Sequence, residues 1–270
     1  MLFKNIPLIS NPSIRRFSQL LRMKVIPVPC LSDNYAYVLI DEDASQVIAV
    51  DPVEPEKVLA VIKSTNLPLA TVLTTHHHAD HSGGNTKLTG LVPGLQVFGG
   101  DSRIPQMTRQ LADGEEFTVG SLKIRALQTF GHTTSSICYY IEDKGERIVF
   151  TGDTLFVGGC GRLFEGTAED MYESLNVKLA ALPGDTRVYA GHEYTKSNLR
   201  FARTVDPHNR ELELKAERCA ELPCTMPSTI AEELATNPFM RVHHPALQSA
   251  SRQTNPINVL REIRRMKDMF

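Results

Sequence analysis

Residues 76–81 place several potential metal ligands close together in the chain. The sequence there reads His-His-His-Ala-Asp-His, and the side chains with suitable spacing for a shared site are His76, His78, Asp80 and His81. Imidazole nitrogens and carboxylate oxygens are ligands that suit Zn²⁺ and neighbouring first-row metals. The alternative is a polar loop or an accidental histidine-rich tract. Because the pattern His-x-His-x-Asp-His is specific, a metal site is the better interpretation.

The neighbouring residues predict that this stretch lies at the end of a strand. Residues 70–74 form an apolar, β-branched run, and residues 82–85 (Ser-Gly-Gly-Asn) predict a turn. A strand that leads into such a turn holds these side chains at one end of a sheet, directed into one small volume. His77 alternates with the ligands and should point away from the site. Thr75, Thr133 and Ser136 are candidates for hydrogen bonds to the ligands.

Three later motifs offer further ligands, each close to the end of a predicted strand. They are Gly131-His132-Thr133, Phe150-Thr151-Gly152-Asp153-Thr154-Leu155 and Ala190-Gly191-His192-Glu193-Tyr194. Taken alone, His132 would be an ordinary loop histidine and Asp153 could merely cap a turn. In this order, and together with residues 76–81, the motifs resemble the signature of the metallo-β-lactamase superfamily.

That resemblance implies an α/β fold, the four-layer αββα metallo-β-lactamase sandwich, and two divalent metal ions per chain. Zinc is the first expectation for their identity, with iron or manganese as alternatives. The implied ligands are His76, His78 and His132 for the first ion, Asp80, His81 and His192 for the second, and Asp153 between both. Three protein ligands per ion plus a bridge leave room for a shared hydroxide, the nucleophile that Asp80 would also orient.

Further motifs narrow the resemblance to one family. They are residues 154–162 (Thr-Leu-Phe-Val-Gly-Gly-Cys-Gly-Arg), 164–167, 191–195, 237–241 (Asn-Pro-Phe-Met-Arg) and 264–268. Together they resemble the glyoxalase II (hydroxyacylglutathione hydrolase) family, from about residue 23 to the C-terminus. The resemblance implies a thioester hydrolase that converts S-D-lactoylglutathione, and other 2-hydroxyacyl-glutathiones, to the free acid and glutathione. This hydrolysis is the second step of methylglyoxal detoxification, in which the free acid is D-lactate.

Glutathione carries two carboxylates and an ammonium group, so its site needs cations and hydroxyl donors beside the metal ions. The residues that the resemblance assigns to substrate binding are Arg162, Phe164, Tyr194, Arg264 and Lys267. Arg264 and Lys267 share a helix face, although a solvated basic helix end is the alternative. Arg162 and Phe164 stand where the family commonly carries Lys and Tyr. An arginine keeps the charge with another geometry, whereas a phenylalanine cannot donate a hydrogen bond.

Other interpretations remain open at this stage. A persulfide dioxygenase of the same superfamily is the nearest enzyme alternative, but it uses a single iron and lacks a comparable helical tail. A metal-stabilised binding module without activity is the alternative from another class, and a missing ligand would favour it. Cys160 is a possible nucleophile, but a metal hydroxide makes one unnecessary, and we expect a buried structural thiol.

Strand signals and helix signals alternate up to residue 192. The predicted strands are 24–28, 34–40, 46–51, 70–74, 96–99, 116–119, 122–128, 137–141, 147–151 and 187–190, with helices at 53–63 and 167–181. Beyond them we expect helices at 196–205, 210–222 and 257–266, a short helix after a capping box at Thr229, and no strand. The domains are therefore a transit segment at 1–22, a catalytic domain at 23–192 and a helical glutathione-binding domain at 193–270.

The first 22 residues differ in composition from the rest of the chain. They contain Lys4, Arg15, Arg16 and Arg22 but no acidic residue. Such a composition is typical of a mitochondrial transit peptide, and an untargeted N-terminus is the alternative. Met23 opens the first clear strand, so a form that starts there would be cytosolic. We therefore expect the protein in the mitochondrial matrix, the cytoplasm or both.

Composition and charge disfavour several classes of partner. The 270 residues carry a net charge of -2, which disfavours nucleic acid as a partner. No apolar run approaches the roughly 18–20 residues of a membrane span, so we expect no membrane partner. The five cysteines contain no Cys-x-x-Cys pair and predict a reducing compartment, without disulfides or a cysteine-based zinc site. We expect a monomer whose partner is a small molecule, the glutathione thioester.

Overall fold

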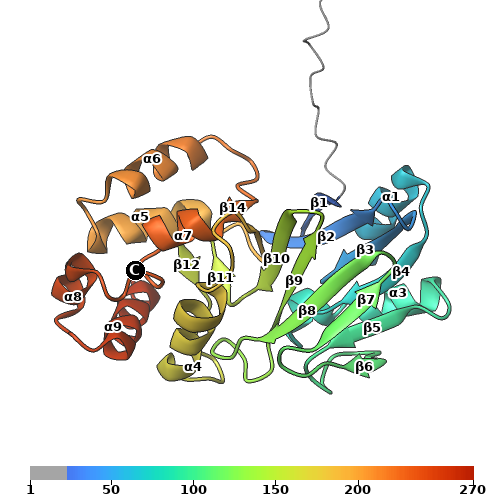
Figure 1. Ribbon diagram of the computed structural model, residues 1–270, viewed down its shortest axis with the longest axis horizontal. Coiled ribbons are helices and arrows are strands. Elements are labelled where there is room, and N and C mark those ends of the chain that lie inside the picture. Colours follow the sequence, from blue (N-terminus) through green and yellow to red (C-terminus); the bar gives the residue numbers. More distant parts are fainter. Residues whose placement is uncertain (1–22) are drawn as a thin grey trace, which may run out of the picture.

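Two six-stranded sheets pack face to face in the computed structural model, which describes residues 23–270 (Figure 1). The first sheet has the order β1 (Met23–Cys30), β2 (Asn34–Asp41), β3 (Gln46–Val50), β4 (Leu69–Leu73), β5 (Gln96–Gly99) and β6 (Arg109–Gln110). The second has the order β14 (Ser228–Thr229), β13 (Arg187–Ala190), β10 (Glu146–Gly152), β9 (Ile137–Asp143), β8 (Leu122–Gln128) and β7 (Glu116–Val119). A separate small hairpin consists of β11 (Leu155–Phe156) and β12 (Gly159–Cys160).

Helices connect the parallel strands of the first sheet. α1 (Pro55–Thr65) leads from β3 to β4, and α2 (Ala79–Ser82) and α3 (Asn85–Leu91) lead from β4 to β5. Pro55 opens α1, where a missing backbone N–H costs no helical hydrogen bond. Val58 and Ile62 lie one turn apart on α1 and pack with Leu88 of α3 against the outer face of the sheet. The crossover helices therefore bury this face.

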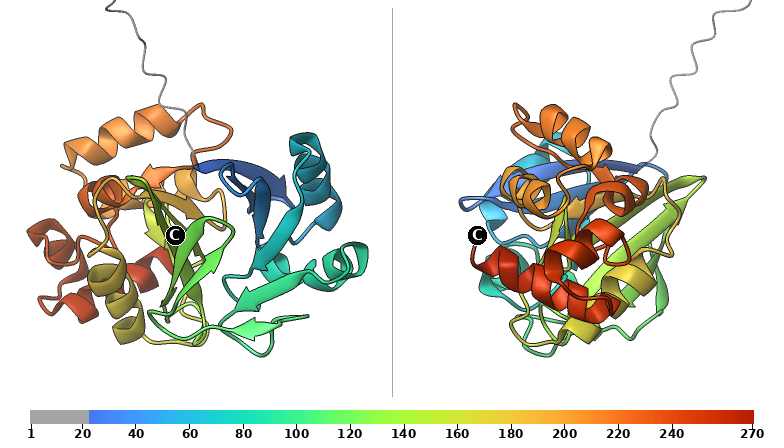
Figure 2. Two further views of the ribbon diagram at one scale, coloured as in Figure 1. Left: turned by 45° about the vertical axis from the view of Figure 1, so that its right-hand side comes forward. Right: turned by 90° about the vertical axis from the view of Figure 1, so that its left-hand side faces the viewer.

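The structure has four layers, and apolar side chains fill the three interfaces between them (Figure 2). Leu39 of β2 and Tyr139 of β9 meet between the two sheets. On the far side of the second sheet, Val149 of β10 packs against Leu175 and Leu179. In the left view of Figure 2 the order from right to left is α1 and α3, the first sheet, the second sheet, and then α4 (Ala168–Tyr172) with the C-terminal helices. The αββα architecture predicted from the sequence is confirmed.

The predicted helix at 167–181 is present but changes its hydrogen-bond pattern partway along. Thr167 and Asp170 form a reciprocal capping box at the start of α4. From Glu173 to Leu179 the chain continues as a π-helix, η1, and the Ala180 N–H donates to the Leu175 carbonyl five residues earlier at 3.0 Å. The sequence contains no signal for this change.

The C-terminal region contributes α5 (Thr195–Val205), α6 (Arg210–Cys219), α7 (Ile230–Thr236), α8 (Pro245–Ser251) and α9 (Pro256–Asp268). Side-chain caps mark the starts of α6 and α7: the Asn209 side chain accepts from the Leu212 N–H, and Thr229 accepts from the Glu232 N–H. The predicted helices at α5, α6, α7 and α9 are confirmed, and α8 is an additional one.

The expectation of no strand beyond residue 190 is wrong. β14 pairs antiparallel with β13, so the helical region adds an edge strand to the second sheet. β14, β6, β11 and β12 each contain only two residues, which is too short for an alternating pattern to appear in the sequence. The main predicted strands all correspond to strands in the structure.

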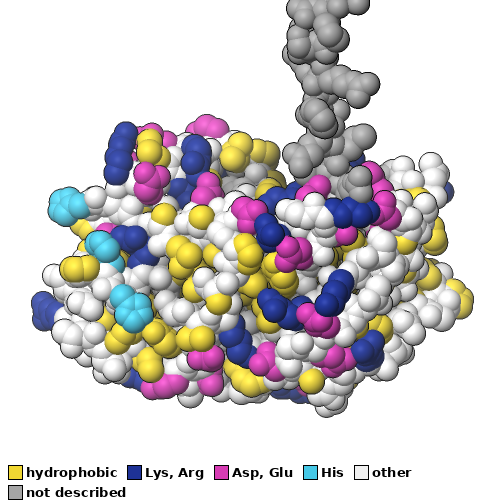
Figure 3. Space-filling view, in the orientation of Figure 1, with side chains coloured by type: hydrophobic (Ala, Val, Ile, Leu, Met, Phe, Trp, Pro, Cys, Tyr) yellow, Lys and Arg dark blue, Asp and Glu magenta, His cyan; other side chains and the backbone are white. Residues whose placement is uncertain are grey.

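The surface and the cysteines agree with the composition. All five cysteines are free, and Cys160 is buried. Among residues 23–270 there is no helix long and apolar enough to cross a membrane. Acidic and basic side chains are interspersed on the face shown in Figure 3. The predicted transit segment, residues 1–22, lies outside the described residues.

Candidate metal centre and adjoining cavity

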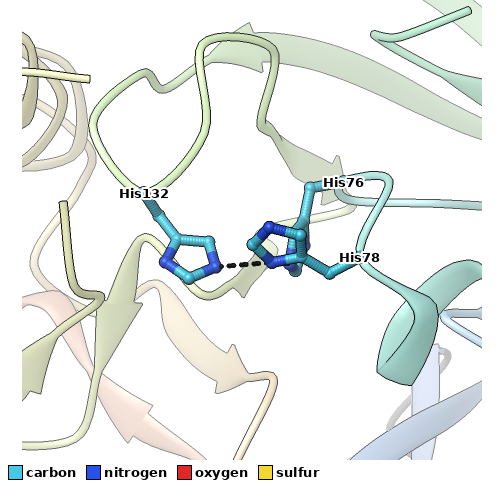
Figure 4. Close-up of side chains that lie close together, drawn as sticks. All are labelled: His76, His78 and His132. Atoms are coloured by element: carbon cyan, nitrogen blue, oxygen red, sulfur yellow. Dashed lines mark hydrogen bonds between the residues drawn. The ribbon is translucent and has the colours of Figure 1, made fainter. Parts of the chain in front are cut away.

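Three histidines from two loops converge at one end of the sandwich (Figure 4). His76 and His78 follow β4, whereas His132 lies in the loop between β8 and β9. The Nδ1 atom of His78 lies 3.1 Å from Nε2 of His76 and 3.0 Å from Nε2 of His132. The alternating spacing at the end of β4 therefore directs two rings toward a third from the opposite sheet.

A second cluster adjoins the first. His81 belongs to α2 and His192 follows β13, and their Nε2 atoms are 3.2 Å apart. The Asp80 carboxylate lies 3.4 Å from His192 Nε2 and 3.8 Å from His81 Nε2. The structure thus brings Asp80, His81 and His192 together as a second group of potential ligands.

Asp153 stands between the two clusters. It follows β10, and its Oδ1 atom lies 3.2 Å from His81 Nε2. Its Oδ2 atom lies 3.4 Å from His192 Nε2 and 3.5 Å from His132 Nε2. A carboxylate in contact with both groups can bind two ions at once. All seven ligands predicted from the sequence therefore meet, and the clusters indicate a site for two metal ions.

Hydrogen bonds on the far side of each ring fix which nitrogen faces the site. The Nδ1 atom of His132 contacts the Arg162 carbonyl at 2.9 Å, that of His81 contacts Asp51 Oδ2 at 3.0 Å, and that of His192 contacts Asp33 Oδ1 at 2.8 Å. Carbonyl and carboxylate oxygens only accept, so each Nδ1 donates its proton. In the neutral form of each ring, Nε2 therefore has a lone pair available to a metal.

Asp51 is the centre of these supporting contacts. This buried carboxylate accepts from the Thr75 N–H at 2.8 Å, from the Thr75 hydroxyl at 2.7 Å and from His81 Nδ1. Because the Thr75 hydroxyl donates to Asp51, its oxygen accepts from His76 Nδ1 at 3.1 Å. One carboxylate thus orients a histidine in each cluster. Gly152, with φ +46, leaves room for Thr75, since a Cβ there would lie 2.4 Å from the Thr75 Oγ1.

The electrostatics fit divalent cations. Lone pairs of several imidazoles converge with the carboxylates of Asp80 and Asp153, an arrangement that a cation stabilises. Burial lowers the pKa of His76, His78 and His132 and keeps these ligands neutral. Burial alone would also lower the pKa of His192, but hydrogen bonds with Asp153 and Asp80 outweigh it and raise that pKa to about 10. A metal ion would replace this proton, so binding would release it.

Three supporting residues escaped the sequence analysis. Asp33 orients His192, and Asp51 orients His81 and Thr75. The Asn34 amide donates to the Asp80 carbonyl at 3.0 Å and to Asp80 Oδ2 at 3.1 Å. All three lie at strand ends of the first sheet but outside any ligand motif. Of the three predicted supporting residues, Thr75 contacts a ligand, whereas Thr133 and Ser136 hydrogen-bond each other at 2.6 Å.

The remaining histidines lie apart from the two clusters. His77 is directed away from them, with its ring nitrogens 3.2 Å from Asp101 and 3.5 Å from Glu165. His208, His243 and His244 are exposed, and His244 caps α8. The orientation of His77 agrees with the sequence interpretation.

A cavity of about 460 Å³ opens beside His132 and Asp153. Its volume falls within the range of roughly 300–1,000 Å³ that is usual for small-molecule sites. All the side chains predicted to bind substrate line it: Arg162, Phe164, Tyr194, Arg264 and Lys267. Tyr194 stacks on the His192 ring at 4.6 Å, and Phe164, 62% exposed, meets the rings of His78 and His132 edge-on at 5.8 and 5.2 Å.

The basic side chains in the cavity differ in how freely they can meet a ligand. Arg264 is buried, and its guanidinium donates to the Cys160 carbonyl at 2.7 Å and to Asp268 Oδ1 at 3.0 Å. Arg162 is more exposed and lies 3.4 Å from the same carboxylate oxygen. Lys267 contacts the Ser197 carbonyl at 3.3 Å. Arg162 and Lys267 are therefore better placed than Arg264 to contact a ligand directly.

Cys160 also lines this cavity but lacks the properties of a nucleophile. Burial raises the pKa of its thiol to about 11, which keeps the thiol protonated at neutral pH. The expectation of a buried structural cysteine is confirmed.

Comparisons with known proteins agree with this site. A family model described as hydroxyacylglutathione hydrolase C-terminus matches residues 193–270, and the metallo-beta-lactamase superfamily model matches residues 99–192. The cytoplasmic hydroxyacylglutathione hydrolase of Arabidopsis thaliana is 50% identical over 257 residues, which cover 92% of this chain and 99% of that protein.

Solved structures show the same fold. The crystal structure of ETHE1 from Myxococcus xanthus has a TM-score of 0.63 at 30% identity and covers 81% of this chain and 84% of its own. The structure of TTHA1623 in a di-iron-bound form has a TM-score of 0.57 at 25% identity and covers 80% and 99% of the two chains. The second structure agrees with a centre for two metal ions.

The position of Asp51 predicts a loss of metal affinity when its charge is removed. In Asp51→Asn the amide keeps the shape and tolerates the positive φ of 47, but it no longer accepts all three hydrogen bonds. We expect the affinity for Zn²⁺ to fall about 10- to 100-fold, measured by competition with a chelator. Asp41→Asn is the matched control, because Asp41 is equally buried but accepts hydrogen bonds from Ser121. Equal affinities in the two variants would contradict this role of Asp51.

Proposed function

Because the chain belongs to the hydroxyacylglutathione hydrolase family of the metallo-β-lactamase superfamily, we propose that it hydrolyses S-D-lactoylglutathione to D-lactate and glutathione. Related 2-hydroxyacyl-glutathiones are substrates of the same kind. The observation that carries this proposal is the single cavity that joins Asp153 and His132 on one side to Arg162, Tyr194 and Lys267 on the other. A thioester bound there has its acyl group beside the ligand clusters and its peptide beside the cations.

The ligands divide between two ions by their contacts. His76, His78 and His132 would hold the first ion, and Asp80, His81 and His192 the second, with Asp153 shared by both. Two divalent ions held there supply a water of lowered pKa and Lewis-acid stabilisation of developing negative charge. The nitrogen and oxygen donors suit zinc best, while iron and manganese remain compatible with them.

Asp80 contributes more than a ligand atom. A hydrogen bond with His192 lowers its pKa far below neutrality, so the carboxylate is ionised and can orient a water for attack on the thioester carbonyl. The Asn34 amide holds the same carboxylate in place. The protein thereby positions its acceptor before substrate arrives.

The wall formed by the C-terminal region suits the peptide of glutathione. Arg162 and Lys267 can pair with its two carboxylates, and the Tyr194 hydroxyl can donate a hydrogen bond. Asp268, which lines the same cavity, is a possible partner for the ammonium group. Arg264 acts mainly by holding Cys160 and Asp268 in place.

A persulfide dioxygenase is the weaker alternative. Such an enzyme would use a single iron, whereas Asp153 contacts His81 of one ligand group and His132 of the other, which supports two ions. The match of residues 193–270 to the hydroxyacylglutathione hydrolase C-terminus also favours a glutathione thioester as substrate.

Hydrolysis of S-D-lactoylglutathione by the purified chain tests the proposal directly. We expect loss of the thioester absorbance together with about two metal ions per chain. Asp153→Ala should lose metal and activity together, because Asp153 contacts both clusters. No turnover, one bound iron and oxygen uptake on glutathione persulfide would instead support the dioxygenase.

Because Phe164 has no hydroxyl to donate a hydrogen bond, we expect the affinity for the substrate to be modestly reduced. Phe164→Tyr adds a hydroxyl at the mouth of the cavity, and one new hydrogen bond contributes about 0.5–1.5 kcal/mol, or up to roughly tenfold in affinity. We expect a lower KM with kcat nearly unchanged, measured by steady-state kinetics. A large fall in kcat would show that the contacts of Phe164 with the His78 and His132 rings matter more than hydrogen bonding.

The titration of the Lys267 ammonium predicts that KM rises at alkaline pH. Burial lowers the pKa of its ammonium to about 8, and the nearby Arg264, Arg200 and Arg162 add to this effect while Asp268 opposes it. The cation is therefore present below pH 8 and is lost as the pH rises through that value. We expect KM for the thioester to increase above pH 8, measured against the rate without enzyme.

Lys267→Arg separates this titration from other effects, because arginine stays charged in that range. Its KM should remain flat above pH 8, whereas the exposed control Lys196→Arg should behave like the unaltered protein. The same alkaline rise in Lys267→Arg would exclude Lys267 as its cause.

We further propose that residues 1–22 direct a mitochondrial form, while a form that starts at Met23 is cytosolic. Met23 is fully buried and opens β1, so the fold can begin there. Fluorescent fusions with and without residues 1–22 should localise to mitochondria and cytosol, respectively. Identical diffuse distributions would contradict the targeting role.

A further inference from the structure

The turn between β11 and β12 is held by side chains of the C-terminal helices at successive backbone positions. The Asn237 amide donates to the carbonyls of Phe156 at 3.2 Å and Gly159 at 2.9 Å. The Asn198 amide donates to the Val157 carbonyl at 3.1 Å. The remaining contacts are from the Gly158 N–H to Glu233 Oε2 at 2.8 Å and from Arg264 to the Cys160 carbonyl. The turn therefore takes its position from the helical region.

The same segment forms one wall of the site. The Phe156 ring contacts the rings of His192 at 5.9 Å and Tyr194 at 5.2 Å. Two residues after β12, the Arg162 carbonyl accepts from His132 Nδ1, and Phe156, Cys160 and Arg162 all line the cavity. A displacement of the turn would move this wall relative to the ligands.

Glu233 is the charged centre of this attachment. Its carboxylate is fully buried, and Oε1 accepts from Lys215 Nζ and from the Ser228 hydroxyl, both at 2.5 Å. Oε2 accepts from the Gly158 N–H and from the Asn237 amide at 3.0 Å. Each oxygen thus has two donors, and only one side of the carboxylate faces the turn.

The ion pair with Lys215 does not by itself explain why a charge is placed here. Lys215 is 2% exposed and Glu233 is fully buried, and the desolvation cost of such a pair often exceeds its electrostatic gain. A buried ion pair contributes specificity instead, because a polar network with all its hydrogen bonds formed fixes one arrangement of the groups around it. Here that arrangement includes the turn at Gly158, whose φ of +66 and contact with Leu199 require glycine.

We propose that Glu233 is a positioning residue for thioester hydrolysis. It acts through the Gly158 N–H to hold the wall of residues 156–162 at the correct distance from the metal ligands. Lys215 orients the Glu233 carboxylate through its hydrogen bond to Oε1. This inference rests on the proposed function, and it adds a residue that touches neither substrate nor metal ligands.

Glu233→Gln tests the role with little change of shape. Lys215 and Ser228 hold the carbonyl oxygen of the new amide, so its NH₂ group faces the Gly158 N–H and the Asn237 amide, where two donors oppose each other. We expect KM for S-D-lactoylglutathione to rise about tenfold while kcat changes less than threefold and metal content stays the same. Hydrogen exchange measured by mass spectrometry should show lost protection in peptides covering residues 155–162.

Glu232→Gln is the matched control. Glu232 precedes Glu233 on α7 and lies 3.6 Å from Lys215 Nζ, but its carboxylate accepts from Arg218 and not from the turn. The Ser228 hydroxyl has a single proton and lies closer to Glu233, at 2.5 Å, than to Glu232, at 3.1 Å. The Glu232→Gln substitution removes a negative charge beside the same lysine but leaves the contact of Glu233 with the turn in place. KM and the protection of residues 155–162 should therefore remain unchanged. Equal effects in Glu232→Gln and Glu233→Gln would overturn the proposal.

The double variant Lys215→Met with Glu233→Leu covers the case in which an unpaired buried lysine prevents folding. It removes both charges, which buried pairs often tolerate, and leucine has no acceptor for the Gly158 N–H. A folded double variant with normal KM and normal protection would overturn the proposal. If the unaltered protein failed to hydrolyse the thioester, the proposed function would fail, and the exchange comparison alone would still decide whether Glu233 holds the turn.

Discussion

Imidazole nitrogens that converge on one another and on two carboxylates are the constraint on which this structure depends. His81 and His192 bring their Nε2 atoms within 3.2 Å, beside the ionised carboxylates of Asp80 and Asp153. Each ring must be held by its other nitrogen, because convergence of these groups is unfavourable without a cation. Asp51 holds the Nδ1 atom of His81 directly and that of His76 through the Thr75 hydroxyl. We therefore expect metal affinity to depend on the strand ends behind the candidate ligands as well as on the ligands.

The two sheets provide a frame stiff enough for this task. Ligands come from both: His76 and His78 from the end of β4, and Asp153 from the end of β10. Tyrosine hydroxyls bridge the sheets close to these ends. Tyr37 donates to the Ala190 carbonyl at 2.5 Å, two residues before His192, and Tyr139 donates to the Thr74 carbonyl at 2.8 Å, two residues before His76. Any shift of one sheet against the other would break these buried hydrogen bonds, which cost more to leave unmade than they contribute when formed.

The sequence predicted the ligands because their signal is local, and it failed where the signal is distant. His76, His78, Asp80 and His81 lie within six residues and end a predictable strand. Asp51, Asp33 and Glu233 are ordinary acidic residues in the sequence, and their roles arise from partners far along the chain. Asp33 meets His192 across 159 positions, and Glu233 meets Gly158 across 75. The two-residue strands were missed for a related reason, since their pairing depends on neighbours rather than on a periodic pattern of their own.

The helical region does more than supply charges to the cavity. The two terminal nitrogens of Arg264 donate to the Cys160 carbonyl and to Asp268, and its guanidinium lies 5.2 Å from the Phe239 ring. Lys267 lies 5.4 Å from the rings of Phe201 and Phe270, so its position is also set by packing. Cations held in this way lose little conformational freedom when an anion binds, which leaves more of the interaction energy for affinity. Since Arg264 contacts the same segment as Glu233 and Asn237, the groups proposed to face the substrate peptide and the wall beside the candidate metal ligands form one connected unit. The geometry of residues 23–192 and that of the C-terminal helices are for this reason coupled through buried polar contacts rather than through surface charge.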